Sequence, residues 1–171
     1  MSARPAPTAP GEPAIEFRPC REGDLDAVGA IERATFPEPW TRDQFSALLA
    51  HPAGIGWVAE IHPGETTGYA IGWVAADEAE LADLAVAPPA RGRGIGSGLV
   101  RTFAREAGVR GARRLYLEVR ASNEGAQRFY ARLGFDVVGR RVGYYRHPRE
   151  DALVMRAELP LAGGGVSGER G

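Results

Sequence analysis

Lysine is absent from this sequence and cysteine occurs once, at Cys20. Without lysine the chain cannot form a Walker A phosphate loop, which ends in Gly-Lys followed by Ser or Thr. One cysteine cannot form an intrachain disulfide, so we expect Cys20 to be a small apolar filler in a cytoplasmic protein. The sequence shows neither a basic-then-apolar leader nor an apolar run of about 20 residues, and we therefore expect no membrane partner.

Charge of one sign is not in excess either. The 21 basic residues, all arginine, face 22 acidic residues, and the formal net charge of −1 predicts no general attraction to nucleic acid. The three histidines, His51, His62 and His147, lack the spacing of metal ligands, so we predict no metal site. What is present is an ordinary globular composition of 171 residues, 44% of them hydrophobic, which suffices for one domain with a core.

Apolar periodicity predicts one domain over residues 15–160. A Pro- and Ala-rich tail at 1–14 and a Gly-rich tail at 161–171 are expected to be disordered. Asp24, Thr41 and Ser122 are placed to cap helices, another helix runs to about Ala107, and residues 62–68 are predicted to form a hairpin turn. The predicted strands cover 15–18, 55–61, 69–75, 80–86, 114–120, 135–146 and 152–159. This order predicts an α/β (α+β) fold with a mixed sheet flanked by helices.

A glycine-rich stretch, Arg91 to Gly98, separates the third strand of the meander from the next helix. Glycines let the backbone approach a ligand closely, and the helix that follows directs free N–H groups and its positive dipole end into the loop. The loop is therefore a candidate pyrophosphate site, although a plain surface turn fits the same residues. It is not a dinucleotide fingerprint, because the third glycine of Gly-x-Gly-x-x-Gly would fall at Ser97 or Leu99.

Two strands are predicted to end near this loop. Ligands of open α/β sheets collect beyond the carboxyl ends of strands, so Leu84-Ala85-Val86 and the loop should line one cleft. The strand at 114–120 would bring Glu118 to the same cleft. Its side chain lies on the face opposite the apolar stripe of Leu115, Leu117 and Val119, because side chains alternate along a strand.

The segment from Leu84 to Gly134 resembles the GCN5-related N-acetyltransferase (GNAT) superfamily. Arg91-Gly92-Arg93-Gly94-Ile95-Gly96 is similar to its acetyl-CoA pyrophosphate loop, Gln/Arg-x-x-Gly-x-Gly/Ala. Four motifs resemble those of the RimI-type alanine N-acetyltransferases that act on bacterial ribosomal proteins. They are Leu117-Glu118-Val119-Arg120-Ala121-Ser122-Asn123, Phe129-Tyr130-x-x-Leu133-Gly134-Phe135, Phe36-Pro37-x-Pro39-Trp40 and Tyr144-Tyr145. The resemblance implies a mostly antiparallel sheet of six to seven strands with about four helices.

The resemblance also implies an activity: transfer of an acetyl group from acetyl-CoA to the N-terminal amine of a protein, most plausibly the N-terminal alanine of a small-subunit ribosomal protein. Glu118 matches the general base of the family and Tyr130 its general acid. The acceptor wall would include Trp40, Tyr144 and Tyr145. The positions that match cofactor contacts are Leu84, Ala85, Val86, Arg91, Gly92, Arg93, Gly94, Ile95, Gly96, Ser97 and Asn123.

Chemistry favours an α-amine, whose reference pKa of about 7.7–8.0 leaves part of it neutral near pH 7, whereas a lysine amine near 10.4 is mostly charged. A weak base then suffices. Each residue also has a purely structural interpretation: a solvent-facing Glu118, a core Tyr130, a first-turn Asn123. Gly92 and Ser97 stand where close relatives often carry Arg. The alternatives are a small-molecule amine or lysine acceptor, and a non-catalytic CoA-binding sensor or partner subunit. We expect a monomer or weak dimer.

Overall fold

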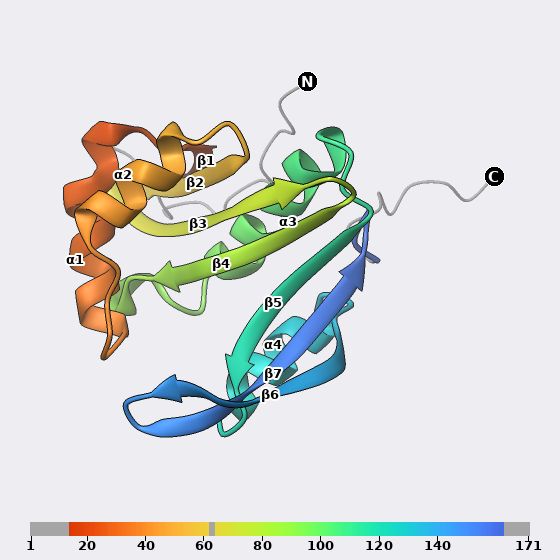
Figure 1. Cartoon of the computed structure of the whole chain (residues 1–171). Helices are drawn as coiled ribbons and strands as arrows, with labels where there is room; N and C mark the ends of the chain where they lie inside the picture. Colours follow the sequence, from red (N-terminus) through yellow and green to blue (C-terminus); the bar gives the residue numbers. More distant parts are fainter. Residues whose placement is uncertain (1–13, 62–63, 163–171) are drawn as a thin grey trace.

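The computed structural model describes residues 14–61 and 64–162, so most of both predicted tails, together with His62 and Pro63 of the predicted turn, lies outside the described residues. Its centre is a seven-stranded sheet in the order β1-β2-β3-β4-β5-β7-β6 (Figure 1). The elements are β1 (Ile15–Pro19), η1 (Glu22–Asp24), α1 (Leu25–Thr35), α2 (Arg42–Ala50), β2 (Gly54–Ile61), β3 (Glu65–Ala75), β4 (Glu78–Val86), η2 (Pro88–Ala90), α3 (Ile95–Val109), β5 (Arg114–Arg120), α4 (Glu124–Arg132), β6 (Asp136–Arg146) and β7 (Arg149–Glu158). Only the β4–β5 pair is parallel among these described strands. The predicted fold class is confirmed.

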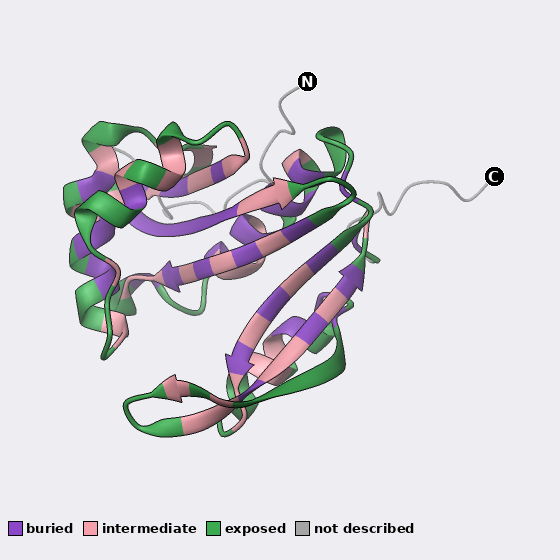
Figure 2. Cartoon of the chain, viewed as in Figure 1, coloured by how far each residue is buried: buried purple, intermediate pink, exposed green. Residues whose placement is uncertain are grey.

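Helices cover both faces of the sheet (Figure 1). On one face α3 and α4 enclose the larger apolar cluster, which includes Leu99 and Phe103 of α3 and Leu115 and Leu117 of β5. On the other face α1 and α2 pack over β2 and β3 around the buried Phe45. Figure 2 shows that burial concentrates between these layers, while the edge strand β6 is exposed along most of its length. Burial of these apolar side chains is the main force holding helices to sheet.

The gap in the sheet lies between β4 and β5. Their pairing covers only Glu78 to Glu80 against Arg114 to Tyr116, and beyond it the two strands diverge (Figure 1). The closed end is fixed by Asp77, whose carbonyl accepts the Arg113 N–H at 2.6 Å. The open end leaves the β5-facing main-chain edge of residues 82–86 without a strand partner in the described chain. A backbone edge in this state is free to bind an extended ligand.

A bulge in β4 determines which of its side chains face the opening. Gly72 of β3 is opposite Leu81 and Ile71 is opposite Asp83, so Ala82 is an extra residue. A bulge reverses the alternation of side chains. Leu81 therefore packs with the α3 cluster, whereas Asp83 lies on the α1 face, the same face as Glu80. The sequence pattern alone would have put Glu80 and Asp83 on opposite faces.

Several boundaries differ from those predicted. Thr41 caps α2 as expected, with Gln44 N–H donating to its hydroxyl. The cap of α4 is Asn123, which accepts the Ala126 N–H at 3.0 Å, and not Ser122. Asp24 makes no side-chain cap hydrogen bond with α1, because it pairs with Arg18 instead at 2.7 Å.

The ends of the domain and of the meander also shift. β3 begins at Glu65, so residues 65–68 of the predicted turn are strand. Leu161, which we assigned to the C-terminal tail, is buried in the larger cluster. Within the described part of the chain, no helix combines the length and apolar content that a bilayer crossing requires.

Candidate active site

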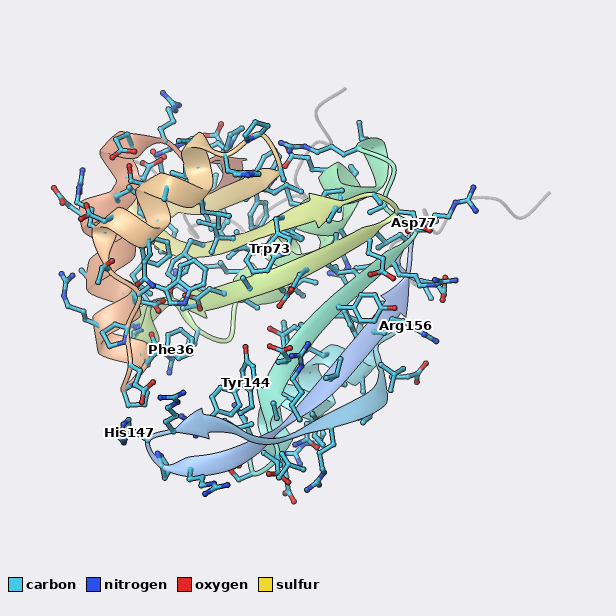
Figure 3. The ribbon with its side chains drawn as sticks, viewed as in Figure 1. Phe36, Trp73, Asp77, Tyr144, His147 and Arg156 are labelled. Atoms are coloured by element: carbon cyan, nitrogen blue, oxygen red, sulfur yellow. The ribbon has the colours of Figure 1, made fainter. Side chains whose placement is uncertain are left out.

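A cavity of about 620 Å³ opens where β4 and β5 diverge. Its walls come from α1 and the α1–α2 loop, from β3, β4 and β5, from α4, and from the β6–β7 hairpin. Figure 3 shows Phe36 and Tyr144 projecting toward each other across the opening, with Asp77 at the closed end of the two strands. At the mouth, His147 Nε2 of the hairpin lies 3.9 Å from Glu38 Oε1 of the loop. The predicted site residues in its wall are Trp40, Leu84, Glu118, Asn123, Tyr130, Tyr144 and Tyr145.

A second cavity, of about 460 Å³, lies beside the glycine-rich loop. Among the predicted cofactor positions it is lined by Leu84, Ala85, Val86, Arg91, Gly92, Gly94, Ile95, Gly96 and Asn123, whereas Arg93 and Ser97 are not in its wall. Thr35, Phe36, Leu84 and Asn123 line both cavities. The two cavities therefore adjoin along the open edge of β4.

The glycine-rich loop has the backbone of an anion cradle. Gly92 and Gly94 have φ angles of +81° and +76°, which L side chains adopt only with strain. Gly94 precedes α3 and provides no side-chain cap, so the first N–H groups of the helix remain free to bind a ligand. Arg91 is held across the loop by a 3.0 Å hydrogen bond from its Nε to the Val86 carbonyl. The loop thus offers main-chain donors to an anion.

Glu118 lies in the wall of the larger cavity beside charges of both signs. Its Oε1 accepts from Arg141 Nε at 2.9 Å, and its side chain is 13% exposed. Glu80 of β4 faces the same space, and burial together with the charge of Glu118 raises the pKa of Glu80. Burial and a hydrogen bond to Glu118 raise the pKa of Tyr144 to about 12. Glu118 is therefore surrounded by a second carboxyl group, the Arg141 guanidinium and the protonated phenol of Tyr144.

Tyr130 is held in place by aromatic packing. Its ring lies between Phe129 and Phe135, with centroid separations of 5.0 and 5.5 Å. Burial, reinforced by the charge of Asp83, raises the pKa of Tyr130 well above its usual range. The hydroxyl therefore stays protonated at neutral pH and is able to donate a proton to an anion that develops in the cavity.

A buried carboxyl pair joins α1 to the sheet behind this cavity. Glu32 of α1 accepts hydrogen bonds from the Tyr69 hydroxyl and, at 3.0 Å, from the Trp40 N–H. Asp83 of β4 is 8% exposed, and its Oδ2 is the one buried side-chain polar atom of the described residues that lacks a hydrogen-bond partner. Burial, followed by the interaction with Glu32, raises the pKa of Asp83 far above its ordinary range. The pair therefore retains a proton at neutral pH.

The hairpin wall is built on aromatic rings held by arginines. The Tyr144 and Tyr145 rings meet edge-on at 5.1 Å, and the Arg120 guanidinium lies 4.2 Å from the centroid of the Tyr145 ring. Arg120 also pairs with Glu150 at 3.4 Å. Such rings offer apolar surface with polar edges, which suits the first residues of a peptide. No described cluster of His, Cys, Asp and Glu side chains could hold a metal.

Sequence reasoning missed four charged residues of the site: Glu32, Glu80, Asp83 and Arg141. Glu32 was detectable, because it falls on the apolar stripe of α1, four residues after Val28 and seven after Leu25. Glu80 and Asp83 were hidden by the bulge. Arg141 stands in a strand with arginines on both sides of the sheet, and nothing in the pattern distinguishes it.

Comparison with known proteins gives one consistent result. Residues 25–135 match the family model described as acetyltransferase (GNAT) family. A Bacillus subtilis relative is 39% identical over 139 residues, covering 81% of this chain and 91% of the relative. The [ribosomal protein bS18]-alanine N-acetyltransferase of Escherichia coli is 34% identical over 141 residues, covering 81% of this chain and 93% of the relative.

The same similarity holds in three dimensions. The crystal structure of the ribosomal-protein-S18-alanine N-acetyltransferase from Escherichia coli matches with a TM-score of 0.78 and 31% sequence identity. The match covers 90% of this chain and 99% of that one.

Proposed function

Because the chain belongs to the acetyltransferase (GNAT) family, we propose that it moves the acetyl group of acetyl-CoA to the N-terminal amine of a protein. Membership makes it an acetyl-CoA-dependent N-acetyltransferase. The relatives are named for alanine of ribosomal protein bS18, so the acceptor we propose is the N-terminal alanine of a small-subunit ribosomal protein. The observation that best supports this proposal is that the glycine-rich loop and its cavity adjoin the larger cavity, which is lined by both Glu118 and Tyr130.

The residues present fit the coenzyme. The free N–H groups at the start of α3 would hold the pyrophosphate, with Arg91 adding positive charge beside it. The open edge of β4 would hydrogen-bond the pantetheine arm as an added strand. Asn123 lines both cavities and would guide the arm from one to the other, although its Oδ1 is already used to cap α4. Acetyl-CoA then supplies the electrophilic thioester carbonyl.

The two proposed catalytic residues divide the proton transfers. Glu118 accepts a proton from the amine, directly or through one water, as the amine nitrogen bonds to the carbonyl carbon. Tyr130 donates its hydroxyl proton to the sulfur as the carbon–sulfur bond breaks. An amide and a thiol are formed, Glu118 is left protonated and Tyr130 is left as a phenolate. Loss of the proton from Glu118 to water and return of a proton from water to Tyr130 restore both residues. Free main-chain N–H groups on the open edge of β4 would stabilise the carbonyl oxygen.

An α-amine is the favoured acceptor on two grounds. Its low basicity means that a weak base suffices to deprotonate it. The mouth of the larger cavity, between Phe36 and Tyr144, would receive the end of a peptide chain. Trp40, Tyr144 and Tyr145 would contact its first residues. We further propose that the enzyme acts in the cytoplasm, as a monomer or weak dimer.

The test is mass spectrometry of peptides incubated with the protein and acetyl-CoA. The panel varies the first residue among Ala, Ser, Gly and Met, and includes an N-blocked peptide with one lysine and a free polyamine. We expect acetylation of the α-amine of the Ala peptide, strongly reduced in Glu118→Gln. Modification of the lysine or polyamine alone would contradict the proposed acceptor, and CoA binding without turnover on any amine would contradict catalysis.

A further inference from the structure

Glu118, the proposed base, is paired with a residue that no sequence pattern singled out. Arg141 reaches from β6, two strands away across β7, and donates its Nε to Glu118 Oε1 at 2.9 Å. The same guanidinium lies 5.6 Å from the centroid of the Tyr144 ring. It also faces Glu80, since its positive charge opposes the rise in the pKa of that carboxyl. One guanidinium thus serves two acids at the edge of the cavity.

The surroundings of Glu118 offer no equivalent cation among the described residues. β4 presents Glu80, a like charge, and β7 presents the apolar Val154 directly opposite Glu118. Arg120, two residues along β5, is bound to Glu150 and to the His147 and Pro148 carbonyls.

The remaining neighbours are phenols and cannot replace the charge. Tyr144 hydrogen-bonds to Glu118, and Tyr145 is close enough for the charge of Glu118 to raise its pKa. Tyr116 precedes Glu118 by two residues on the same strand face. Without Arg141, Glu118 would face Glu80 with neutral donors only.

The β6–β7 hairpin is shaped to aim Arg141. The pairing of the two strands is interrupted between Arg141 and Tyr145, and Gly143 at that bulge has a φ of +63°. Asp151 of β7 fixes the bulge by accepting the Gly143 N–H at 2.9 Å and pairing with Arg140 at 2.7 Å. Adjacent arginines therefore have separate roles: Arg140 anchors the hairpin, and Arg141 extends to the cavity.

We propose that Arg141 is a positioning residue that holds the Glu118 carboxylate turned toward the acceptor amine, against the repulsion of Glu80. The inference rests on the proposed function, because it takes Glu118 as the base. Charge-assisted N–H···O⁻ bonds are strong and directional. An adjacent cation stabilises the ionised form of a carboxylate, and an adjacent carboxylate destabilises it.

A first experiment measures the effect without turnover. In protein labelled with ¹³C at the glutamate carboxyls, Glu118 is assigned by its loss in Glu118→Gln and followed by NMR at about pH 7. In Arg141→Gln its carboxyl resonance should move, because the charge-assisted bond from the Arg141 Nε is lost. The matched control, Arg105→Gln, removes one positive charge at an exposed position of α3 outside both cavities and should leave the resonance in place. An unmoved Glu118 resonance in Arg141→Gln would overturn the proposal.

A second experiment tests the consequence for rate. With the Ala peptide, Arg141→Gln should lower kcat about tenfold and change the KM for acetyl-CoA little, because the base is no longer held toward the amine. Arg141→Lys should recover part of the loss, and Arg105→Gln should keep the wild-type rate. A wild-type kcat in Arg141→Gln, or an equal loss in Arg105→Gln, would overturn the proposal. If the proposed function itself is wrong, the wild type will not acetylate the peptide, while the NMR comparison still decides the role of Arg141.

Discussion

At the scale of single residues, the proposed proton acceptor and the proposed proton donor have different surroundings. Tyr130 lies among aromatic rings, where its ionised form is costly, so its hydroxyl stays protonated. Glu118 instead accepts a charge-assisted hydrogen bond from the Arg141 guanidinium. Two titratable groups in one cavity with opposite environments form the pattern expected of an acid and a base.

Replacing Tyr130 by Phe tests the donor. The ring and its packing are kept, so stability should change by less than about 1 kcal/mol, while kcat should fall about a hundredfold for want of a proton donor. Steady-state kinetics with the Ala peptide measures the fall, and thermal unfolding checks the fold. Tyr116→Phe, which removes a hydroxyl from the neighbouring strand outside the cavity, is the control and should retain the wild-type rate. A Tyr130→Phe rate above half that of the wild type would remove Tyr130 from the mechanism.

At the scale of elements, β4 determines most of the geometry. Its open edge and its bulge are both backbone features, and neither leaves a mark in the sequence. The strand itself was predictable, because residues 79–86 form a short, largely apolar run that ends before Pro88 and Pro89. The bulge was not, because a run that is apolar apart from Glu80 and Asp83 does not fix which face each residue occupies. The secondary structure of β4 was thus predictable, whereas the face of the sheet on which Asp83 lies was not.

The start of α4 shows a related limit. Ser122 and Asn123 are adjacent, and both residue types make good N-caps, so local sequence does not decide between them. A tertiary contact decides it, because the Ser122 N–H is bound by Glu150 of β7, far along the chain. Asn123 is then left to accept the Ala126 N–H.

The loop before α3 gives a prediction for the cradle. Gly94 has a left-handed φ, so Gly94→Ala should cost about 1 kcal/mol of folding stability and weaken CoA binding about tenfold as the loop adjusts. Calorimetric titration with CoA measures the binding. Gly108→Ala, in the same helix with open space around it and an ordinary φ, should keep the wild-type affinity and raise stability slightly. Equal CoA affinity in Gly94→Ala and the wild type would contradict the role of the loop.

At the scale of the whole molecule, the buried Glu32 and Asp83 join the helical layer to the sheet. Both carboxyls are nearly inaccessible, and Glu32 also holds the Trp40 N–H at the entrance of the α1–α2 loop. The pKa of Asp83 is raised in the native state, whereas in the unfolded chain an Asp has a pKa of about 3.9. Between these values the native state holds a proton that the unfolded state releases, so the contribution of Asp83 to stability falls as pH rises above about 4.

Asp83→Asn removes this titration. Relative to the wild type, the variant should gain melting temperature as pH rises, with the difference about 5 °C larger at about pH 8 than at about pH 5. Circular dichroism melts at the two pH values measure it. Asp77→Asn, at an exposed position next to β4, is the matched control and should show no such trend. A difference for Asp83→Asn that does not change with pH would mean that the pair holds no extra proton in the folded state.

The order of strands and helices could be predicted from the sequence, whereas the arrangement of the residues that form the site could not. Strand and helix order depends on local periodicity, which the chain displays clearly. The cavity, by contrast, is assembled from α1 and the α1–α2 loop, three strands, α4 and a hairpin. Glu32, Glu80 and Asp83 lie in its wall, and Arg141 reaches its edge by pairing with Glu118. Their proximity depends on strand divergence and on two bulges, which only the folded chain reveals.

The parting of β4 and β5 has a consequence for how such an enzyme changes its choice of partner. The side that would bind the donor consists mainly of main-chain groups, which remain in place when side chains away from Gly92 and Gly94 are substituted. The side that would meet the acceptor is made of loop and hairpin residues such as Phe36, Tyr144 and Tyr145. Descendants of this protein can therefore acquire new recipients by exchanging a few outer residues while the supply of acetyl groups continues undisturbed.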